Sequence, residues 1–166
     1  MLADVLHPGS PRDFERIAGL LAAADWFLPN SDQLLALTGR GDIAAAVADV
    51  LALGTGAVAV TLGADGCLVT AAGGSLAHVP APGVDVVDTT GCGDGFSAGM
   101  IAALLLGCGR MDAARLGCAC GALVATGLGS DAGIVSLDHA LGFLGRHQPP
   151  AASRIRELLA AAAVPA

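Results

Sequence analysis

Glycine and aspartate are concentrated in one short segment, DTTGCGDGFSAG, which occupies residues 88–99 and leads into an apolar stretch. The apolar stretch predicts a helix that begins inside this segment. Asp94 then stands at the helix N-terminus, where a carboxylate can cap backbone N–H groups and complement the helix dipole. The position also allows a second role, because glycines leave those N–H groups open to an outside anion, with Asp94 beside it as a base.

The spacing of the glycines favours chemistry on a phosphoryl group. Gly91 and Gly93 flank the small Cys92, so successive N–H groups can point into one concavity and stabilise charge on a transferring phosphoryl group. Asp94 would orient a substrate hydroxyl and take its proton as it attacks. Glycine-rich turns with an acidic residue are also common at purely structural helix starts, and this segment alone leaves that alternative open.

The charged residues limit what could hold such a phosphate. The chain has eight arginines, no lysine and a formal net charge of -7. A Walker A loop and the strand lysine of protein kinases both require an ammonium group on the nucleotide phosphates, so both are excluded. A nucleic-acid surface requires a basic stripe, which this charge balance disfavours. Backbone N–H groups, arginine or a metal must therefore hold any bound phosphate.

The size and apolar content predict one globular domain. The chain has 166 residues, of which 54% are hydrophobic, enough for a real core. The longest apolar runs, residues 95–108 and 116–129, are shorter than the ~20 residues that a membrane span needs, so we expect buried helices and no membrane partner. The N-terminus lacks a secretory pattern, which favours the cytoplasm.

The five cysteines indicate small buried side chains in a reducing compartment. The four histidines are scattered along the chain, so we expect no metal site built on Cys and His.

Strand-like and helix-like segments alternate along the first half of the chain. We expect strands at residues 3–7, 25–30 and 57–63, a hairpin from 66–71 and 75–80, and helices at 14–24, 31–39, 42–54, 95–106, 112–126, 137–145 and 153–163. This order predicts an α/β fold with a doubly wound, mostly parallel sheet. Ligands of such folds bind beyond the carboxyl ends of the strands, which would gather Asn30, residues 61–63 and residues 88–94.

Four segments in order resemble the ribokinase-like (PfkB-type) carbohydrate kinases. DTTGCGD, residues 88–94, is similar to the family signature DTxGAGD. PNSDQLLALTG at 29–39 resembles the NxxE…LTG segment, VTLGADG at 60–66 resembles a T-x-G-x-x-G nucleotide turn, and ACGALVATGLGSDAG at 119–133 resembles a small-residue helix with its following loop. The likeness implies a ribokinase-like fold that phosphorylates a sugar with ATP and Mg²⁺, with K⁺ as a further candidate ion.

The resemblance also implies roles for individual residues. Asp94 matches the catalytic base, and Gly91, Cys92 and Gly93 match the anion hole. The implied nucleotide-binding residues are Asn30, Thr61, Gly63, Gly66, Cys118 and Gly121. Asp88 matches the carboxylate of a monovalent-cation site, which carbonyls of Thr90, Ala125, Leu128 and Ser130 would complete. Structural alternatives exist for these positions: Thr61 and Gly63 could end a strand in a tight turn, Asp88 could form a turn, and Cys118 could pack on a buried helix face.

Two departures from the family pattern bear on activity. Gln33 stands where the family carries a glutamate that helps to organise Mg²⁺. Glutamine keeps hydrogen bonding but lacks the negative charge, which predicts a weaker site for a hard cation. The chain also resembles only the C-terminal half of family members, so residues 1–166 would form one partial domain without the lid and most sugar contacts. We therefore expect impaired activity in isolation, and association with a partner or another copy through an open sheet edge.

Other functions remain in competition with a sugar kinase. A non-catalytic nucleotide-binding or assembly module would fit Gln33 and the short length, whereas Asp94 and the complete glycine turn favour catalysis. A nucleoside or hydroxymethylpyrimidine kinase shares part of the DTxGAGD pattern. GLGSDA, residues 127–132, also matches the G-x-G-x-x-A form of the dinucleotide fingerprint, but it follows a predicted helix where that fingerprint requires a strand.

Overall fold

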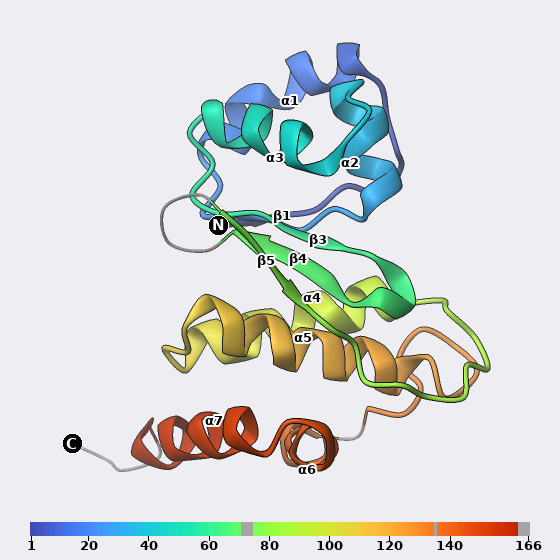
Figure 1. Cartoon of the computed structure of the whole chain (residues 1–166), viewed down its shortest axis with the longest axis vertical. Coiled ribbons are helices and arrows are strands. Elements are labelled where there is room, and N and C mark those ends of the chain that lie inside the picture. Colours follow the sequence, from blue (N-terminus) through green and yellow to red (C-terminus); the bar gives the residue numbers. More distant parts are fainter. Residues whose placement is uncertain (71–74, 135, 163–166) are drawn as a thin grey trace. The chain divides into compact units, whose positions relative to one another are not determined.

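The computed structural model describes residues 1–70, 75–134 and 136–162. Their contacts divide the chain into two compact units. Unit 1 comprises residues 1–63 and 67–78, and unit 2 comprises residues 64–66 and 79–166. The elements of both units are labelled in Figure 1.

The strands form two small sheets. Their bounds are β1 Leu2–Ala3, β2 Trp26–Phe27, β3 Ala59–Thr61, β4 Cys67–Thr70 and β5 Leu76–Val79. β1 pairs in parallel with β2, while β3 pairs antiparallel with β4, which lies between β3 and β5. Isolated parallel bridges join Phe27 to Val58 and Asn30 to Thr61.

The predicted mostly parallel sheet is not found among the described residues. Parallel pairing is limited to the two-residue strands β1 and β2 and the isolated bridges, whereas β3 and β4 run antiparallel. The cause is the short connection between β3 and β4, a 3₁₀ turn at Gly63–Asp65, which can only reverse the chain because a parallel crossover needs a dozen or more residues. The fold is therefore mixed α/β and mostly helical. The expected hairpin turn at 71–74 lies outside the described residues.

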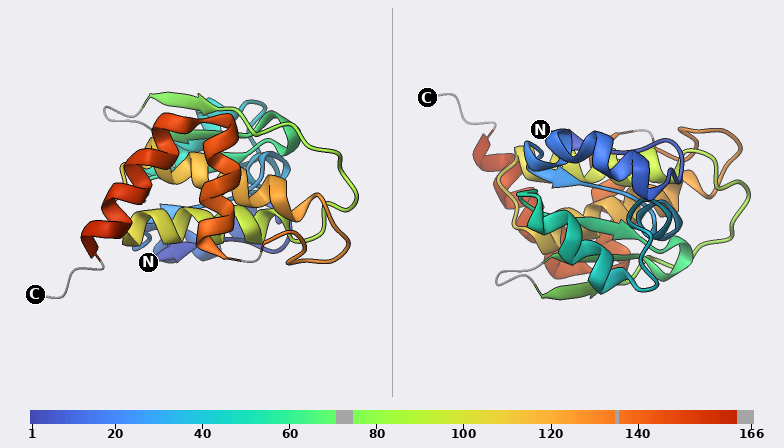
Figure 2. Two further views of the ribbon diagram at one scale, coloured as in Figure 1. Left: turned by 90° about the horizontal axis from the view of Figure 1, so that it is seen from below. Right: turned by 90° about the horizontal axis from the view of Figure 1, so that it is seen from above.

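Helices α1, α2 and α3 lie on one face of the unit 1 strands (Figure 1; Figure 2, right). Their bounds are α1 Pro11–Ala22, α2 Ser31–Thr38 and α3 Ile43–Ala52. The limits predicted from the sequence at residues 39 and 42 are found: Gly39 ends α2 in the left-handed conformation, and the Asp42 carboxylate caps α3 by accepting the Ala45 N–H at 2.9 Å. The core between helices and strands contains fully buried Phe27 and Leu34.

Unit 2 is built on a close pair of helices, α4 Cys92–Leu105 and α5 Arg110–Val124. Glycines allow this approach: a Cβ added to Gly99 would lie 2.9 Å from the Gly117 Cα, and a Cβ added to Gly117 would lie 2.9 Å from the Phe96 carbonyl oxygen. The predicted apolar runs thus form packed core helices. Among the helices of the described ranges, none combines the length and the hydropathy needed to cross a membrane.

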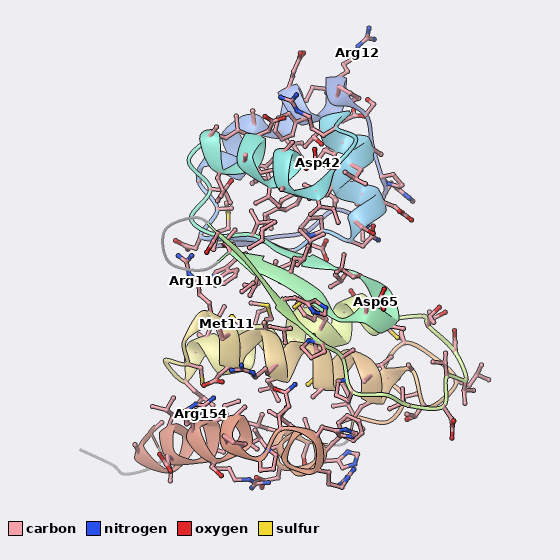
Figure 3. The ribbon with its side chains drawn as sticks, viewed as in Figure 1. Arg12, Asp42, Asp65, Arg110, Met111 and Arg154 are labelled. Atoms are coloured by element: carbon pink, nitrogen blue, oxygen red, sulfur yellow. The ribbon has the colours of Figure 1, made fainter. Side chains whose placement is uncertain are left out.

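Helices α6 Leu137–His147 and α7 Pro149–Ala162 pack on α5 (Figure 2, left). The sequence-based boundary of α7 at residue 153 was wrong, because the helix begins at Pro149, and proline is tolerated in a first helical turn. Arg154, labelled on α7 in Figure 3, donates two hydrogen bonds to Asp112 of α5 at 2.6 and 2.7 Å. Arg115 donates a third at 2.8 Å, and Arg154 is the main cause that keeps the pKa of Asp112 below its ordinary value.

Candidate active site

The turn before α4 shapes the start of that helix. Gly91 is the residue that precedes the first helical turn, and it adopts the left-handed conformation with φ of 80°. A Cβ at this position would lie 2.1 Å from the Ser130 carbonyl oxygen, so only glycine fits. The turn is therefore held directly against the loop that follows α5.

The first turn of α4 has exposed backbone N–H groups beside the Asp94 carboxylate. The Gly95 N–H donates to the Gly91 carbonyl at 2.8 Å, and the Cys92 N–H donates to the Thr89 carbonyl at 3.2 Å. In the described part of the chain, no hydrogen bond uses the N–H of Gly93 or Asp94. Gly93 has no atom within 4 Å of the place where a Cβ would stand, and both residues are exposed. This geometry leaves room for an anion at the helix N-terminus.

Asp88 connects the turn to the loop after α5. Its carboxylate accepts the Thr90 N–H at 2.9 Å through Oδ1 and the Gly129 N–H at 3.2 Å through Oδ2. These hydrogen bonds, those from Thr90 above all, hold the pKa of Asp88 below its ordinary value. Asp88 therefore stays ionised and clamps two loops that lie far apart in the sequence.

Acidification is expected to weaken this clamp. A carboxylate with a lowered folded-state pKa contributes its full stabilisation above the ordinary value of about 3.9, and loses it as the pH falls through the lower folded-state value. Asp88→Asn should therefore lower the melting temperature near pH ~6 and have a smaller effect near pH ~2.5. Melting curves followed by far-ultraviolet circular dichroism at both pH values check this. An equal drop in melting temperature at both pH values would contradict the stabilising role assigned to the ionised Asp88 carboxylate.

The residues expected at a monovalent-cation site lie in the same two loops. The Ala125 carbonyl accepts the N–H of Val87 at 2.8 Å and that of Asp88 at 3.4 Å. The Ser130 carbonyl faces Gly91, and Leu128 is exposed next to the Gly129 N–H that binds Asp88. Oxygen atoms with one ionised carboxylate suit a hard cation, although Ala125 already shares its carbonyl with two N–H groups.

Cys92 and Gly121 form the contact between the turn and α5. A Cβ on Gly121 would lie 3.0 Å from the Cys92 carbonyl oxygen, so the small residue at 121 lets the two helices meet here. Burial is the main cause that raises the pKa of the Cys92 thiol, and the negative charge of the Asp88 carboxylate raises it further. Cys92 therefore stays uncharged at neutral pH and brings no negative charge to the open N–H groups.

Two predicted nucleotide-binding residues of unit 2 converge on Val79. A Cβ on Gly66, where φ is 94°, would lie 2.1 Å from the Val79 carbonyl oxygen. The Cys118 thiol lies 3.8 Å from the same oxygen. Both residues thus have a packing role at the end of β5, and a role in nucleotide binding stays a prediction.

Unit 1 brings together the other predicted nucleotide-binding residues. Asn30 and Thr61 pair in an isolated parallel bridge, and the Thr61 N–H donates to the Pro29 carbonyl at 3.0 Å. Gly63 follows Thr61 at the start of the 3₁₀ turn, with φ of 61° and open space where a Cβ would stand. These residues occupy the carboxyl end of β3 and the start of α2, as the sequence pattern predicts.

Gln33 has a structural role that the sequence analysis missed. Asn30 accepts the Gln33 N–H and Gln33 accepts the Asn30 N–H, each at 2.8 Å, which forms a capping box at the start of α2. The spacing N-x-x-Q is a visible signal for this cap. The other end of the Gln33 amide donates to the Val5 carbonyl at 2.7 Å, a contact that no local pattern could reveal.

Gln33→Glu is expected to destabilise unit 1. Glutamate can still accept the Asn30 N–H, but an ionised carboxylate cannot donate to Val5, so an acceptor is left unpaired at a cost of about 1–2 kcal/mol. Trp26 is the one tryptophan of the chain and lies in unit 1, so urea unfolding followed by its fluorescence measures the change. Gln148→Glu, in unit 2, is the matched control. A Gln33→Glu variant as stable as the parent at neutral pH would contradict this role.

The pfkB family carbohydrate kinase model matches residues 3–136 of this chain. The bifunctional protein HldE of Caulobacter sp. (strain K31) is 34% identical over 168 residues, which cover 96% of this chain and 33% of that protein. The sequence relationship therefore extends over nearly the whole chain but over only a third of this relative.

Solved structures of two kinases share the fold. Aminoimidazole riboside kinase from Salmonella enterica, complexed with aminoimidazole riboside and an ATP analogue, is 34% identical with a TM-score of 0.73, covering 86% of this chain and 51% of that one. Arabidopsis thaliana ribokinase, complexed with ribose and ATP, is 27% identical with a TM-score of 0.75, covering 86% of this chain and 46% of that one. This chain thus spans about half of each enzyme. Together with the family match over residues 3–136, these findings show that the chain belongs to the pfkB family of carbohydrate kinases.

Proposed function

We propose that this chain carries the phosphate-binding turn and the catalytic base of an ATP-dependent sugar kinase. One observation supports this most strongly: the open N–H groups of Gly93 and Asp94 and the exposed Asp94 carboxylate occupy the same first turn of α4. An anion stabiliser and a proton acceptor are the two groups that phosphoryl transfer to a hydroxyl requires.

In the proposed reaction, Asp94 accepts the proton of a sugar hydroxyl as that oxygen forms a bond to the γ-phosphorus of ATP. The bond between the γ-phosphorus and the oxygen that bridges it to the β-phosphate breaks, and ADP leaves with the electron pair. The N–H groups of Gly93 and Asp94 stabilise the charge on the transferring group, since they are aligned before the reaction and need no reorganisation. Cys92, uncharged at neutral pH, does not oppose that charge.

Two metal ions belong to the proposal. Mg²⁺ would neutralise phosphate charge, and it is usually bound through the substrate phosphates with one or two carboxylates. The described residues contain no group of three or more His, Cys, Asp or Glu side chains that could hold a metal, so the nucleotide would supply most of the ligands. For K⁺, the ionised Asp88 with the carbonyls of Thr90, Ala125 and Ser130 are the residues of fitting chemistry.

The substrates proposed for the chain follow from its relatives. The two solved kinases hold ribose or a riboside together with ATP or its analogue, so a sugar hydroxyl is the proposed acceptor. Asn30, Thr61 and Gly63 in unit 1, and Gly66, Cys118 and Gly121 in unit 2, are proposed to contact the nucleotide. Because this chain spans about half of those enzymes, sugar binding is proposed to need more polypeptide than the 166 residues.

One observation supports a second candidate, a nucleotide-binding module without catalysis. Position 33 is a glutamine, so it offers no carboxylate to organise Mg²⁺. Both ends of its amide are already hydrogen-bonded within unit 1. Such a module would bind ATP through the same α4 turn and release no ADP.

Calorimetric titration with ATP and Mg²⁺, followed by an assay of sugar-dependent ADP release, tests the proposal. Heat of binding together with ADP release that requires a sugar supports the kinase, and binding with no turnover in the presence of the complementary half of a related kinase supports the module. Absence of ATP binding would refute both.

A further inference from the structure

The loop that follows α5 closes on itself at its base. Its two ends meet, since a Cβ added to Gly127 would lie 2.6 Å from the Ala132 Cβ. The next residue, Gly133, lies against the end of α5, where a Cβ would stand 2.2 Å from the Leu123 carbonyl oxygen. Residues 127–132, called here the α5 loop, therefore leave the helix and return directly to it.

The Leu123 carbonyl is the point at which the α5 loop is attached. Carbonyls in the last turn of a helix have no partner within the helix, but this one accepts the Thr126 N–H at 3.1 Å and the Thr126 hydroxyl at 2.7 Å. Gly133 packs against the same oxygen with φ of 77°, in the left-handed region that favours glycine. Only a residue without a Cβ fits this position.

The tip of the α5 loop holds the turn before α4 at two points. The Gly129 N–H donates to the Asp88 carboxylate at 3.2 Å. The Ser130 carbonyl oxygen packs against Gly91, where a Cβ would lie only 2.1 Å away. Gly91 directly precedes the first turn of α4, so the position of the exposed N–H groups in that turn depends on where the tip of the α5 loop stands.

We propose that Gly133 is a positioning residue for the phosphate-binding turn. This inference rests on the proposed function, which assigns the N–H groups of Gly93 and Asp94 to the transferring phosphoryl group. Gly133 touches neither the nucleotide nor the sugar in this proposal. It acts by letting the α5 loop close, and the closed loop holds the turn in place.

A larger residue at position 133 must move the loop, because the end of α5 is fixed. Leu123 and its neighbour Val124 are buried in the core, so their backbone resists displacement. The loop yields instead, and its tip leaves Asp88 and Gly91. A displacement of about 1 Å at reacting groups, even one caused by a distant substitution, can lower the rate about 10²-fold.

Gly133→Ala tests this role, and Gly107→Ala is the matched control. Gly107 follows the other end of α4, has φ of 81°, and has no atom within 4 Å of the place where a Cβ would stand. Both variants thus put alanine into a left-handed backbone in unit 2. Only Gly133→Ala also overlaps a carbonyl oxygen, so the difference between the two variants measures the effect of opening the loop.

Amide hydrogen exchange of the full chain, followed by NMR, reports on the turn without any ligand. We expect the N–H groups of Gly95 and Gly129 to exchange at least about tenfold faster in Gly133→Ala, because their acceptors lie in the turn. The N–H of Ala119, buried in the middle of α5, should keep its rate. Calorimetry should show ATP binding weakened about tenfold or more in Gly133→Ala and unchanged in Gly107→Ala.

The possible outcomes separate this inference from the proposed function. Unchanged exchange at Gly95 in Gly133→Ala would overturn the inference, as would an equal effect of Gly107→Ala or faster exchange throughout unit 2, which would indicate a general loss of stability. Unchanged ATP affinity of Gly133→Ala would overturn it as well. A parent chain that binds no ATP would refute the proposed function, whereas exchange at Gly95 would still decide whether Gly133 holds the turn.

Discussion

Replacing Asp94 by asparagine is expected to lower sugar-dependent ADP release by about 10²–10⁴-fold, the usual contribution of a positioned general base. Asparagine has nearly the same shape but cannot accept the hydroxyl proton. The assay uses the chain joined with the complementary portion of a related kinase, where the full site is expected. ATP affinity should stay equal or increase, because the substitution removes a negative charge beside the phosphate site.

Measuring both ADP release and ATP affinity separates a catalytic role of Asp94 from a structural one. Loss of a helix-capping carboxylate alone would reduce stability slightly and leave the rate of the folded enzyme unchanged. Asp32→Asn is a suitable control, since Asp32 also lies in the first turn of a helix and is exposed. Full ADP release by Asp94→Asn would exclude Asp94 as the base, and a parallel loss of ATP binding would indicate a structural role.

Replacing Gly91 by alanine is expected to cost unit 2 at least about 3 kcal/mol of unfolding free energy. The left-handed backbone, with φ of 80°, costs a residue with a Cβ about 1–2 kcal/mol. The remainder comes from overlap, because the new Cβ would lie 2.1 Å from the Ser130 carbonyl oxygen, and backbone on one side must move. Such movement would also separate the two loops that Asp88 joins.

Gly93→Ala is the matched control two residues away. No atom lies within 4 Å of its Cβ position, and alanine favours a helix by up to about 1 kcal/mol over glycine. Gly93→Ala should therefore be as stable as the parent or more so, but its methyl group should weaken ATP binding at the open N–H groups. Urea unfolding followed by far-ultraviolet circular dichroism reports the helices of both units, while Trp26 fluorescence reports unit 1. Equal stability of Gly91→Ala and the parent would contradict the conformation assigned to the turn.

Local features of this fold were predictable because local chemistry determines them. Gly39 and Asp42 mark a helix end and a helix start through preferences that depend on a few neighbouring residues. The predicted helix after Cys92 was found for the same reason, since glycines, Asp94 and a long apolar run occur together. The family resemblance rests on these same ordered segments, and the family match confirms it.

Features that depend on distant residues could not be predicted from local patterns, although the family resemblance did imply that Asp88 and residues 125–130 share one site. The amide of Gln33 reaches Val5, and Asp88 reaches Gly129, across 28 and 41 positions of sequence. Neither contact leaves a periodic or local pattern. The mostly parallel sheet was not found for a local reason: alternating strands and helices indicate parallel pairing, but the 3₁₀ turn after β3 reverses the chain into an antiparallel neighbour. The gathering of the unit 1 and unit 2 site residues stays a prediction.

The arginines that meet on Asp112 set a practical limit on shortened forms of the chain. The family match ends at residue 136, which suggests a convenient place to truncate. A chain cut there would lose Arg154 and leave Asp112 with Arg115 as its remaining ion-pair partner among the described residues. It would also expose the surface of α5 on which α6 and α7 pack. Expression plasmids for this protein should therefore extend at least through Ala162, beyond the boundary that homology suggests.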